Sequence, residues 1–482
     1  MYDAIVIGAR CTGAVTAMLL ARHGHRVLLV DRGFIPSDVH RGHFIHRHGP
    51  KRLADWGLLD KVVATNCPPL TTHLTDFGDF PLVGRNIRQG NVAWGYAPRR
   101  RELDQVLVEA AIEAGAEFRP NFLVESCLWD GDRVVGIRGR DVRRTISSTE
   151  NALIIIGADG RNSNIARAVA APSYEETPTL TCWYFSYWSG VPTEGFEWYL
   201  RKSRVIFSFL TNDNLFAIFI GWPIDEFGSV RADIEGQFMQ VVDQIPDFAE
   251  RVRSGRREER FYGAADLPNF LRRPSGPGWA LVGDAGCHKD PMMANGICDA
   301  FRDADFLSMA IHEGLAGQCQ LDDALMGYER RRNKATIAEY RENIAAAKFT
   351  PVSPELLQLR LALRGNQEDT NRFVMMLEGR ISNEEFFHPD NLQRILANAE
   401  GRPSYRPRTN THARRKTFGG YRCLHKHNHC LGSRGHGFVN NHRFREKNSV
   451  RTRGHECPLS TREICSSEYS PRSQWTYSAS LP

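Results

Sequence analysis

The chain opens with Asp3-Ala-Ile-Val-Ile-Gly8-Ala-Arg-Cys-Thr-Gly13, the stretch that decides its fold. An apolar strand runs into a glycine-rich turn, and the run Ala14–His23 that follows has the pattern of a helix. Residues 26–30 form a second apolar strand, which ends on Asp31, 18 residues after Gly13. Such a turn lets backbone N–H groups approach a pyrophosphate, and an acid about 20 residues further on accepts a ribose hydroxyl. The sequence therefore predicts a dinucleotide-binding βαβ unit.

This turn departs from the G-x-G-x-x-G pattern at its middle glycine, where Arg10 stands. The motif alone is weak, but strand, turn, helix, strand and acid in the right order make the prediction strong. We expect Arg10 to loosen the approach of the backbone to the pyrophosphate. A cationic side chain close to the pyrophosphate would compensate for this.

Composition and length suit a soluble protein with two or three domains, since the chain has 482 residues and 24% charged residues. Its longest apolar runs are of strand length, below the roughly 20 residues of a membrane span. The first strand begins at Tyr2 or Asp3, which leaves no room for a signal peptide. The seven cysteines before residue 400 are scattered without obvious pairs, as in a reducing compartment. We therefore expect a cytoplasmic protein with free thiols and no integral membrane segment.

Charge is divided unevenly between the body and the tail of the chain. Residues 405–482 carry 15 Arg and Lys against four acids, so they hold a charge of +11 within a net charge of +6. This tail, from about residue 403, lacks apolar periodicity and is expected to be disordered. Contact with nucleic acid or an anionic membrane is expected only through the tail. A frameshift or an extension of the coding sequence is a second explanation of the composition of this tail.

We predict no metal site in the chain. The tail holds several cysteines and histidines, but the six residues between Cys423 and Cys430 do not match the usual two to four of zinc sites.

Three acids follow short apolar strands: Asp31, Asp159 and Asp284. The carboxyl ends of parallel strands meet at one edge of a sheet, which is where ligands bind. Three acids at one edge suit a ligand rich in hydroxyl groups, such as a ribose or a ribityl chain. Shortly after Asp284, Pro291 and small residues precede a helix expected from Gly296 to Glu313, whose free N–H groups would favour an anionic ring atom.

Between Thr179 and Phe261 the chain is dense in aromatic residues and alternates like an antiparallel sheet, with one helix expected at about residues 231–244. Further helices are expected at residues 99–114, 321–346 and 354–400. The aromatic residues either line a pocket for an apolar or aromatic substrate or reflect the ordinary preference of strands for aromatic side chains.

Together, the motifs Gly8–Gly13, Gly157-Ala-Asp159-Gly160 and Gly283-Asp284 with Pro291 and Gly296 resemble the class A flavoprotein monooxygenases, the para-hydroxybenzoate hydroxylase-like FAD family. The resemblance covers roughly residues 1–345. It implies an α/β fold with a Rossmann-like FAD-binding domain built on a parallel sheet, an inserted antiparallel β-sheet substrate domain and a C-terminal helical segment. The implied FAD-binding domain spans residues 1–70, 96–172 and 275–345, the substrate domain 71–95 and 173–274, the helical segment 346–402 and the tail 403–482.

The resemblance also implies which residues bind the cofactor. Gly8 and Gly13 would hold the FAD pyrophosphate, Asp31 the adenosine ribose, Val124 the adenine and Asp284 the ribityl chain. Asp159 belongs to a motif associated with both FAD and NAD(P)H. The complete set of expected cofactor-binding residues is Gly8, Ala9, Arg10, Gly13, Asp31, Arg32, Arg100, Val124, Asp159, Gly160, Asp284, Pro291, Gly296 and Ile297. Two further departures from the family pattern are Ala294, where many members have glycine, and Cys298, where many have asparagine.

The activity implied by the resemblance is reduction of FAD by NAD(P)H, capture of molecular oxygen as a flavin hydroperoxide, and hydroxylation or epoxidation of an apolar or aromatic small molecule. The sequence identifies no catalytic acid or base. His43, His46 and His48 either approach the flavin or belong to a basic surface loop.

Other activities stay open at this point. Geranylgeranyl reductases share these motifs and saturate prenyl double bonds. A flavin-dependent halogenase is disfavoured because the chain has no Trp-x-Trp-x-Ile-Pro motif. A flavin-binding sensor or scaffold with a basic tail is an alternative of another class. The sequence leaves the substrate, the choice between NADH and NADPH and the oligomeric state undetermined.

Overall fold

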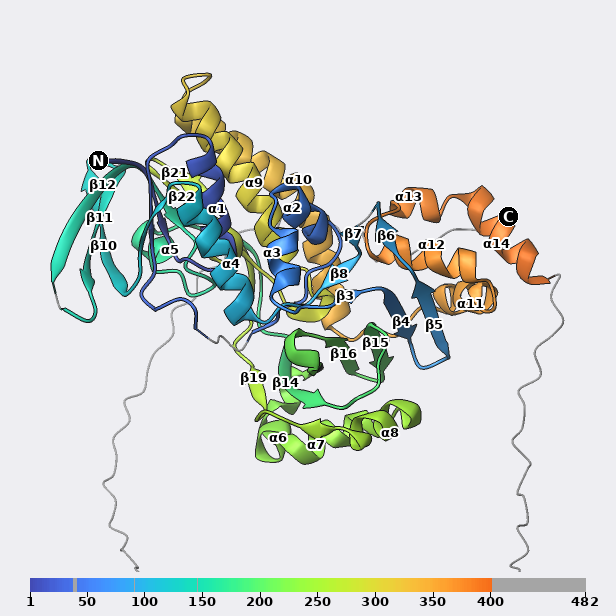
Figure 1. Ribbon diagram of the computed structural model, residues 1–482. Helices are drawn as coiled ribbons and strands as arrows, with labels where there is room; N and C mark the ends of the chain where they lie inside the picture. The colour runs from blue at the N-terminus through green and yellow to red at the C-terminus, as the bar shows by residue number, and fades with distance from the viewer. Residues whose placement is uncertain (38–40, 91, 145, 401–482) are drawn as a thin grey trace, which may run out of the picture. The chain divides into compact units, whose positions relative to one another are not determined.

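The computed structural model describes residues 1–37, 41–90, 92–144 and 146–400, and Met1–Tyr405 forms one compact unit (Figure 1). The predictions of disorder, absence of zinc and nucleic-acid contact for the tail concern residues outside this range. The subdivision of the unit into an FAD-binding and a substrate domain stays a prediction.

A parallel sheet forms the first half of the fold. The strand β1 (Tyr2–Ile7) lies in its middle, because it pairs in parallel with β2 (Val27–Val30) on one side and with β12 (Ser147–Gly157) on the other. β9 (Glu117–Arg119) extends the sheet beyond β2, and β22 (Trp279–Leu281) lies beside β12, both in parallel. The antiparallel strands β10 (Phe122–Asp130), β11 (Arg133–Asp141) and β21 (Ser275–Gly276) complete it. The predicted Rossmann-like sheet is confirmed.

Apolar side chains cover both faces of this sheet. On one face, side chains of β1 and β2 pack against four helices. These helices are α1 (Cys11–Arg22), α4 (Arg100–Glu113), α9 (Gly296–Leu315) and α10 (Leu321–Ala347). The other face packs against β10, β11 and α5 (Asn164–Ala168). Continuous apolar runs such as Ile154-Ile155-Ile156 are explained by this burial on both faces.

A second large sheet lies next to the first. Its strand order is β18 (Arg256–Arg257), β14 (Thr181–Ser189), β17 (Phe216–Pro223), β16 (Arg204–Leu210), β15 (Phe196–Arg201), β4 (Thr72–Asp76) and β5 (Pro81–Arg85), with β19 (Tyr262–Ala264) paired to β14. The pairs are antiparallel as expected, except that β4 joins β15 in parallel. Residues 72–85 therefore belong to the same sheet as residues 181–223.

The alternation of side chains in this sheet separates two aromatic cores. Trp183, Phe185 and Phe207 point to one face and share a cluster with the C-terminal helices. Tyr184, Ile206 and Trp222 point to the other face, which packs against helices below the sheet in Figure 1. The sequence predicted one helix here, but three are present, α6 (Phe227–Ala232), α7 (Ile234–Val242) and α8 (Pro246–Ser254). Asp233 caps α7, and Pro246 begins α8 at a position where its missing N–H costs nothing.

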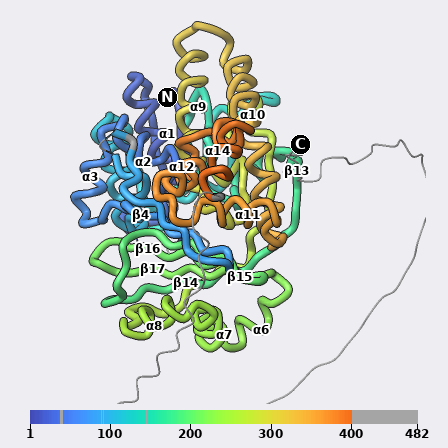
Figure 2. The backbone as a smooth tube through the Cα atoms, turned by 90° about the vertical axis from the view of Figure 1, so that its right-hand side faces the viewer, coloured from blue at the N-terminus to red at the C-terminus, as the bar shows by residue number. Residues whose placement is uncertain are grey.

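The C-terminal segment is helical, as predicted. It comprises α11 (Pro354–Leu363), α12 (Gln367–Leu377), α13 (Asn383–Phe386) and α14 (Pro389–Glu400). Figure 2 shows these helices in front of the sheets, with α12 close to the strands that include β4. Contacts between α12 and β5 fix them there.

The remaining elements are short. They are α2 (Gly49–Asp55), α3 (Leu59–Ala64), the pairs β3 (Pro69–Leu70) with β8 (Gly95–Tyr96) and β6 (Arg88–Gln89) with β7 (Val92–Ala93), and a small sheet of β13 (Ser173–Thr177), β20 (Asn269–Arg272) and β23 (Cys287–His288).

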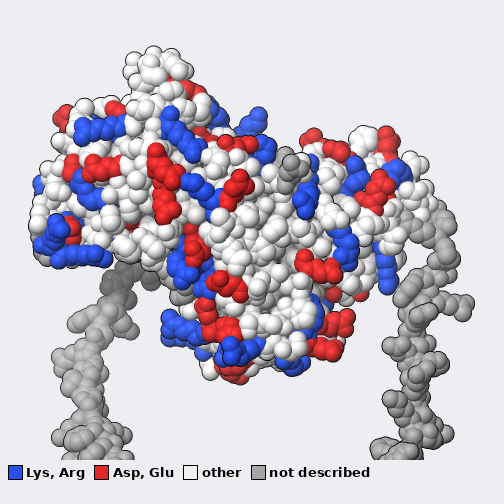
Figure 3. Space-filling model, viewed as in Figure 1, with Lys and Arg blue, Asp and Glu red and all other residues white. Residues whose placement is uncertain are grey.

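The general surface and covalent features agree with the sequence. The seven cysteines within the described ranges are all free, as predicted. Among the described helices, none is long and apolar enough to cross a membrane. On the face drawn in Figure 3, basic and acidic side chains are interspersed rather than gathered into a field of one sign.

Candidate functional site

The predicted ligand-binding edge of the parallel sheet is present. Gly8 follows β1, Asp31 follows β2, Asp159 lies just beyond β12, and Asp284 lies in the turn η3 (Gly283–Ala285) after β22. Since these four strands are parallel, their carboxyl ends bring the three acids and the glycine-rich turn to one edge. This is the arrangement that the spacing of the acids predicted.

Two glycines are required in the turn for steric reasons. Gly8 has a φ of +102°, and a Cβ there would lie 2.5 Å from the carbonyl oxygen of Ala158. A Cβ on Gly13 would lie 1.8 Å from the carbonyl oxygen of Gly8. The end of β1 is therefore packed tightly against both β12 and the start of α1.

Asp31 fastens the turn in place. Its Oδ2 accepts a hydrogen bond from the N–H of Ala9 at 2.8 Å, and its Oδ1 accepts one from the N–H of Gly33 at 2.8 Å. The carboxylate is thus held by the backbone of its own site, and the remaining lone pairs stay available to a ligand. Arg32, beside it, is exposed.

Arg10 has a different role from the one expected. Its guanidinium contacts the buried carboxylate of Asp104 on α4 at 2.8 Å and donates to Ser37 Oγ at 2.8 Å. The charge of Arg10 is therefore engaged by the protein instead of being reserved for a pyrophosphate. Arg10 is the N-cap residue of α1, and its side chain makes no hydrogen bond to the backbone of that helix.

Asp104 is a site residue that the sequence reasoning missed. It is fully buried and also receives the guanidinium of Arg100, one helical turn earlier, at 2.9 Å. Burial lowers the pKa of Arg100, but the ion pair with Asp104 opposes this effect, and the pKa is raised overall. Burial raises the pKa of the Cys11 thiol to about 12, so this cysteine is not a thiolate. The spacing Arg100-x-x-x-Asp104 was the signal in the sequence, because it places both side chains on one helix face.

The other predicted residues of this edge have the following positions. Asp159 accepts hydrogen bonds from the hydroxyl of Ser163 at 2.5 Å and the N–H of Asn164 at 2.7 Å, so it holds the start of α5. Gly160 has a φ of +82° and open space around it. Val124 is buried on β10, and Asp284 is half-buried within electrostatic range of Arg100.

The start of α9, which is the second helix end expected to bind the cofactor, is also open. The turn η4 (Pro291–Met293) is capped by Asp290, whose carboxylate accepts from the N–H of Met292 at 3.1 Å. Ala294 then adopts a left-handed conformation with a φ of +53°, which glycine adopts more readily than alanine. A Cβ on Gly296 would meet nothing within 4 Å, whereas Ile297 is buried.

These residues fit FAD. Among the residues that the structure describes, no side chain caps the first turn of α1 or α9, so the N–H groups there are free to bind anionic groups. The strand-end acids supply acceptors for ribose and ribityl hydroxyls at the same sheet edge.

Comparison with known proteins agrees with the interpretation of this edge of the parallel sheet as a site for FAD. Residues 1–225 match a family described as an FAD binding domain. A digeranylgeranylglycerophospholipid reductase of Methanosarcina acetivorans is 25% identical over 350 residues, which cover 70% of this chain and 81% of the relative. The chain is thus similar to flavoproteins over most of its length. It is an FAD-dependent oxidoreductase, and its similarity to enzymes over most of the chain speaks against the sensor or scaffold alternative.

Two solved structures show the same fold as this flavoprotein. The myxobacterial chondrochloren halogenase CndH has a TM-score of 0.66 at 20% identity and covers 83% of this chain and 96% of its own. PqsL of P. aeruginosa, in complex with 2-aminobenzoylacetate, has a TM-score of 0.64 at 21% identity and covers 72% of this chain and 95% of its own.

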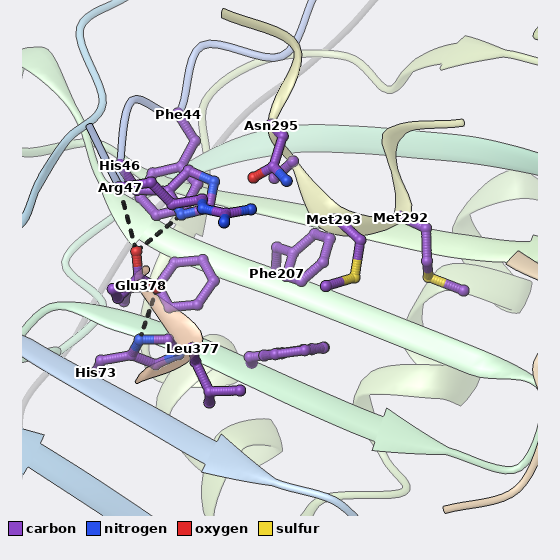
Figure 4. A pocket seen from close by; sticks show the side chains of 13 residues that line it. Phe44, His46, Arg47, His73, Phe207, Met292, Met293, Asn295, Leu377 and Glu378 are labelled. Atoms are coloured by element: carbon purple, nitrogen blue, oxygen red, sulfur yellow. Dashed lines mark hydrogen bonds and ion pairs between the residues drawn. The ribbon is translucent and has the colours of Figure 1, made fainter. Parts of the chain in front are cut away.

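A small cavity of the flavoprotein lies between the second sheet, the turn η4 and the C-terminal helices (Figure 4). Its apolar wall includes Phe44, Phe196, Trp198, Phe207, Met292 and Leu377. Its polar wall is formed by His46, Arg47, His73, Asn295 and Glu378. The aromatic strands therefore do line a cavity, and the short segment before α9 closes one side of it.

Glu378 is the charged centre of this cavity. Its buried carboxylate lies 2.8 Å from His46 Nδ1 and 3.1 Å from His73 Nδ1, and Figure 4 shows it between the two rings. Burial alone would raise the pKa of Glu378, but the two histidines outweigh burial and hold it well below its usual range. No local pattern indicated this cluster, because its members lie in three distant segments of the chain.

The three histidines of residues 43–48 are not part of a basic surface loop. His43 and His46 are buried, and His48 contacts the carbonyl oxygen of Cys298 through Nε2 at 3.0 Å. His43 lies between the carbonyl oxygen of Ala97 and the hydroxyl of Tyr187, each at 3.0 Å, and burial lowers its pKa to about 3. The surface-loop interpretation was therefore wrong, and the segment packs against the start of α9.

Proposed function

We propose that the flavoprotein is an NAD(P)H-dependent monooxygenase that transfers one oxygen atom to an apolar or aromatic small molecule. The observation that carries the proposal is the aromatic cavity, which is lined by the turn η4 and by the residue before α9. PqsL, a probable FAD-dependent monooxygenase solved with 2-aminobenzoylacetate, supports a small aromatic substrate.

We also propose the residues that hold the cofactor. The backbone of Gly8, Ala9, Arg10 and Gly13 would bind the pyrophosphate, with Asp31 at the adenosine ribose and Val124 near the adenine. Asp284 and Arg100 would lie along the ribityl side, and the segment from Pro291 to Ile297 would face the flavin ring. Bound FAD would supply hydride acceptance and oxygen activation. Asp159 and Gly160 stay candidates for contact with FAD or NAD(P)H.

The residues of this chain would position the substrate and exclude water from it. The walls of Phe196, Phe207 and Met292 exclude water from a substrate, which protects reactive species from side reactions. The free N–H groups at the start of α9 would stabilise negative charge on the ring of a reduced flavin.

A second candidate is the reduction of prenyl double bonds. The similarity to digeranylgeranylglycerophospholipid reductases over most of the chain favours it. In that case the apolar cavity would hold part of a polyene chain.

The test is reduction of the purified yellow protein by NADH or NADPH without oxygen, followed by admission of oxygen with a panel of phenols and prenyl lipids. A monooxygenase consumes one O₂ per oxygenated product, and its product carries label from ¹⁸O₂. A saturated prenyl product formed without oxygen would support the reductase instead. A protein without bound FAD would contradict both.

A further inference from the structure

An acidic residue lies in the first turn of α9, the helix whose start we propose to lie at the flavin ring. Gly296 begins this helix, and Asp299 is the acid of its first turn. A helix N-terminus carries about half an elementary positive charge. The full negative charge of a carboxylate in that turn exceeds this charge, so Asp299 by itself would make the start of α9 repel an anionic group.

Two basic side chains counter the charge of Asp299. Lys289 Nζ lies 2.7 Å from Asp299 Oδ2, and Arg302 Nη1 lies 2.8 Å from Asp299 Oδ1. The three side chains are largely buried, with exposed fractions of 8% for Lys289, 14% for Asp299 and 7% for Arg302. Water therefore screens these charges only weakly, and each of them acts over a longer distance than a surface charge.

Both members of the pair Lys289–Asp299 are ionised at neutral pH. Burial alone would raise the pKa of Asp299, but the charges of Lys289 and Arg302 outweigh burial and hold it well below its usual range. Burial alone would lower the pKa of Lys289, but the ion pair with Asp299 opposes this effect, and the pKa is raised overall. The two charges therefore cancel over the whole physiological pH range.

Lys289 is the cation that serves Asp299 alone. It lies between β23 and η4, and within the part of the chain that the structure describes, Asp299 is the one acid that forms an ion pair with its ammonium group. Arg302 also contacts Asp303 through Nη2 at 2.9 Å, so its charge is shared between two carboxylates.

The other basic groups near Asp299 are engaged elsewhere or uncharged. Arg47 lies within electrostatic range of Asp299 but pairs with Glu339 at 2.9 Å. Burial lowers the pKa of His48 to about 3, so its ring is neutral. Neutralisation of Asp299 therefore depends mainly on Lys289.

Resting on the placement of the flavin in the proposed function, we propose that Lys289 is a positioning residue that acts on the bound flavin through Asp299. Because Lys289 neutralises this acid, the start of α9 stays positive, and its free N–H groups stabilise negative charge on the reduced ring. The lysine thereby favours the reduced form of the cofactor over the oxidised form and raises its midpoint potential. This role does not depend on which substrate the enzyme takes.

The midpoint potential of the bound flavin tests the proposal without turnover. The FAD-loaded protein is reduced stepwise with dithionite in the absence of oxygen, together with a dye of known potential, and the absorbance of both is followed. We expect Lys289→Met to weaken the preference for reduced over oxidised FAD about ten-fold, which is the effect of a unit charge at a separation on the order of 10 Å and a dielectric constant of about 20. For a two-electron reduction, this corresponds to a fall of about 30 mV in the potential.

Three further variants separate the charge of Lys289 from its packing. Asp299→Asn should raise the potential, because it leaves the charge of the lysine uncompensated. Lys289→Met combined with Asp299→Asn should return the potential to near the wild-type value, since the pair is then neutral again. Lys289→Arg keeps the charge and should also keep the potential. A purely structural role of Lys289 predicts neither the opposite signs nor the return.

The matched control is another ion pair of α9, further from the start of the helix. Arg52 Nε on α2 lies 2.5 Å from Asp305 Oδ2, and the two side chains are 22% and 29% exposed. Arg52→Gln should change the preference for reduced FAD by less than about two-fold, because this pair is better screened by water. FAD content and thermal unfolding of every variant are measured in parallel.

Equal potentials of wild type and Lys289→Met would overturn the proposal, and so would shifts of Lys289→Met and Asp299→Asn in the same direction. If Lys289→Met does not fold because its buried acid is unpaired, Asp299→Asn and the double variant still decide the question. If a substrate is oxygenated while the potentials do not follow the charge, the proposed function survives without this inference. If the potentials follow the charge but no oxygenated product forms, Lys289 still sets the potential of the flavin and the proposed monooxygenase function fails.

Discussion

At the scale of single residues, Asp290 shows how the turn before α9 is held. It is buried under that turn, where its carboxylate accepts from Thr181 Oγ1 at 2.6 Å and from the N–H of Met292. Burial raises the pKa of Asp290 to about 6, although these hydrogen bonds oppose the shift. The folded protein therefore prefers the protonated form of this side chain over the range in which the unfolded chain is already ionised.

Asp290→Asn should change how stability depends on pH. Because the pKa of Asp290 is raised in the folded state, its contribution is intact below the unfolded pKa of about 4 and is lost as the pH rises through about 6. Relative to wild type, the variant should gain up to about 3 kcal/mol in unfolding free energy between pH 4 and pH 7. Urea unfolding at several pH values measures this, with the exposed turn residue Asp132→Asn as control. If the difference in unfolding free energy between Asp290→Asn and wild type stays constant with pH, Asp290 does not titrate in this range.

The glycine-rich turn gives a second test at residue scale. Gly13→Ala would place a methyl group 1.8 Å from the carbonyl oxygen of Gly8, so the turn must shift. We expect a loss of about 3 kcal/mol in stability and a sharp fall in bound FAD. Gly228→Ala on α6, where a Cβ meets nothing within 4 Å, should leave both quantities nearly unchanged. Flavin absorbance per protein and urea unfolding provide the readings, and normal FAD content in Gly13→Ala would contradict the packing argument.

At the scale of elements, one side chain ties the C-terminal helices to the second sheet. Arg360 on α11 is fully buried and binds Asp79, in the turn between β4 and β5, through Nε at 2.8 Å and Nη2 at 2.9 Å. Its Nη1 also donates to Thr75 Oγ1 at 3.0 Å. This contact holds the helices that deliver Glu378 against the strand that carries His73.

Arg360→Ala should therefore loosen α11 and α12 from the sheet. The loss of a buried, bidentate ion pair costs about 3–5 kcal/mol. Limited proteolysis should cut the variant in residues 350–390 faster than wild type. Arg372→Ala, which removes an exposed pair with Glu385 at 3.2 Å, should cost less than about 1 kcal/mol. Equal proteolysis of the two variants would mean that Arg360 does not hold these helices.

Most elements could be predicted because their patterns are local. The helix expected at residues 99–114 is α4 (Arg100–Glu113). The helix expected at residues 231–244 is α7 (Ile234–Val242), whereas α6 and α8, which Asp233 and Pro246 separate from it, were not predicted. The parallel pairing of β4 with β15 could not be predicted, since the two strands lie more than 100 residues apart and nothing local encodes their register.

At the scale of the whole molecule, Met1–Tyr405 forms one compact unit that contains both sheets and the cavity. A chain that ends at residue 405 should therefore keep its full FAD content and a melting temperature within a few degrees of the full chain. Flavin absorbance and thermal unfolding of the two chains test this. Loss of FAD from the shorter chain would show that residues 406–482 support the fold.

The sequence by itself determined the class of fold and the cofactor, because a glycine-rich turn and three strand-end acids are local signals whose spatial meeting follows from the rules of parallel sheets. Tertiary structure alone decided what these residues contact. It directs Arg10 to Asp104, and it assembles His46, His73 and Glu378 around one cavity. The reason is that long-range packing, not local pattern, selects the partners of a buried charge, and such a charge is stable only where distant segments bring its counterparts.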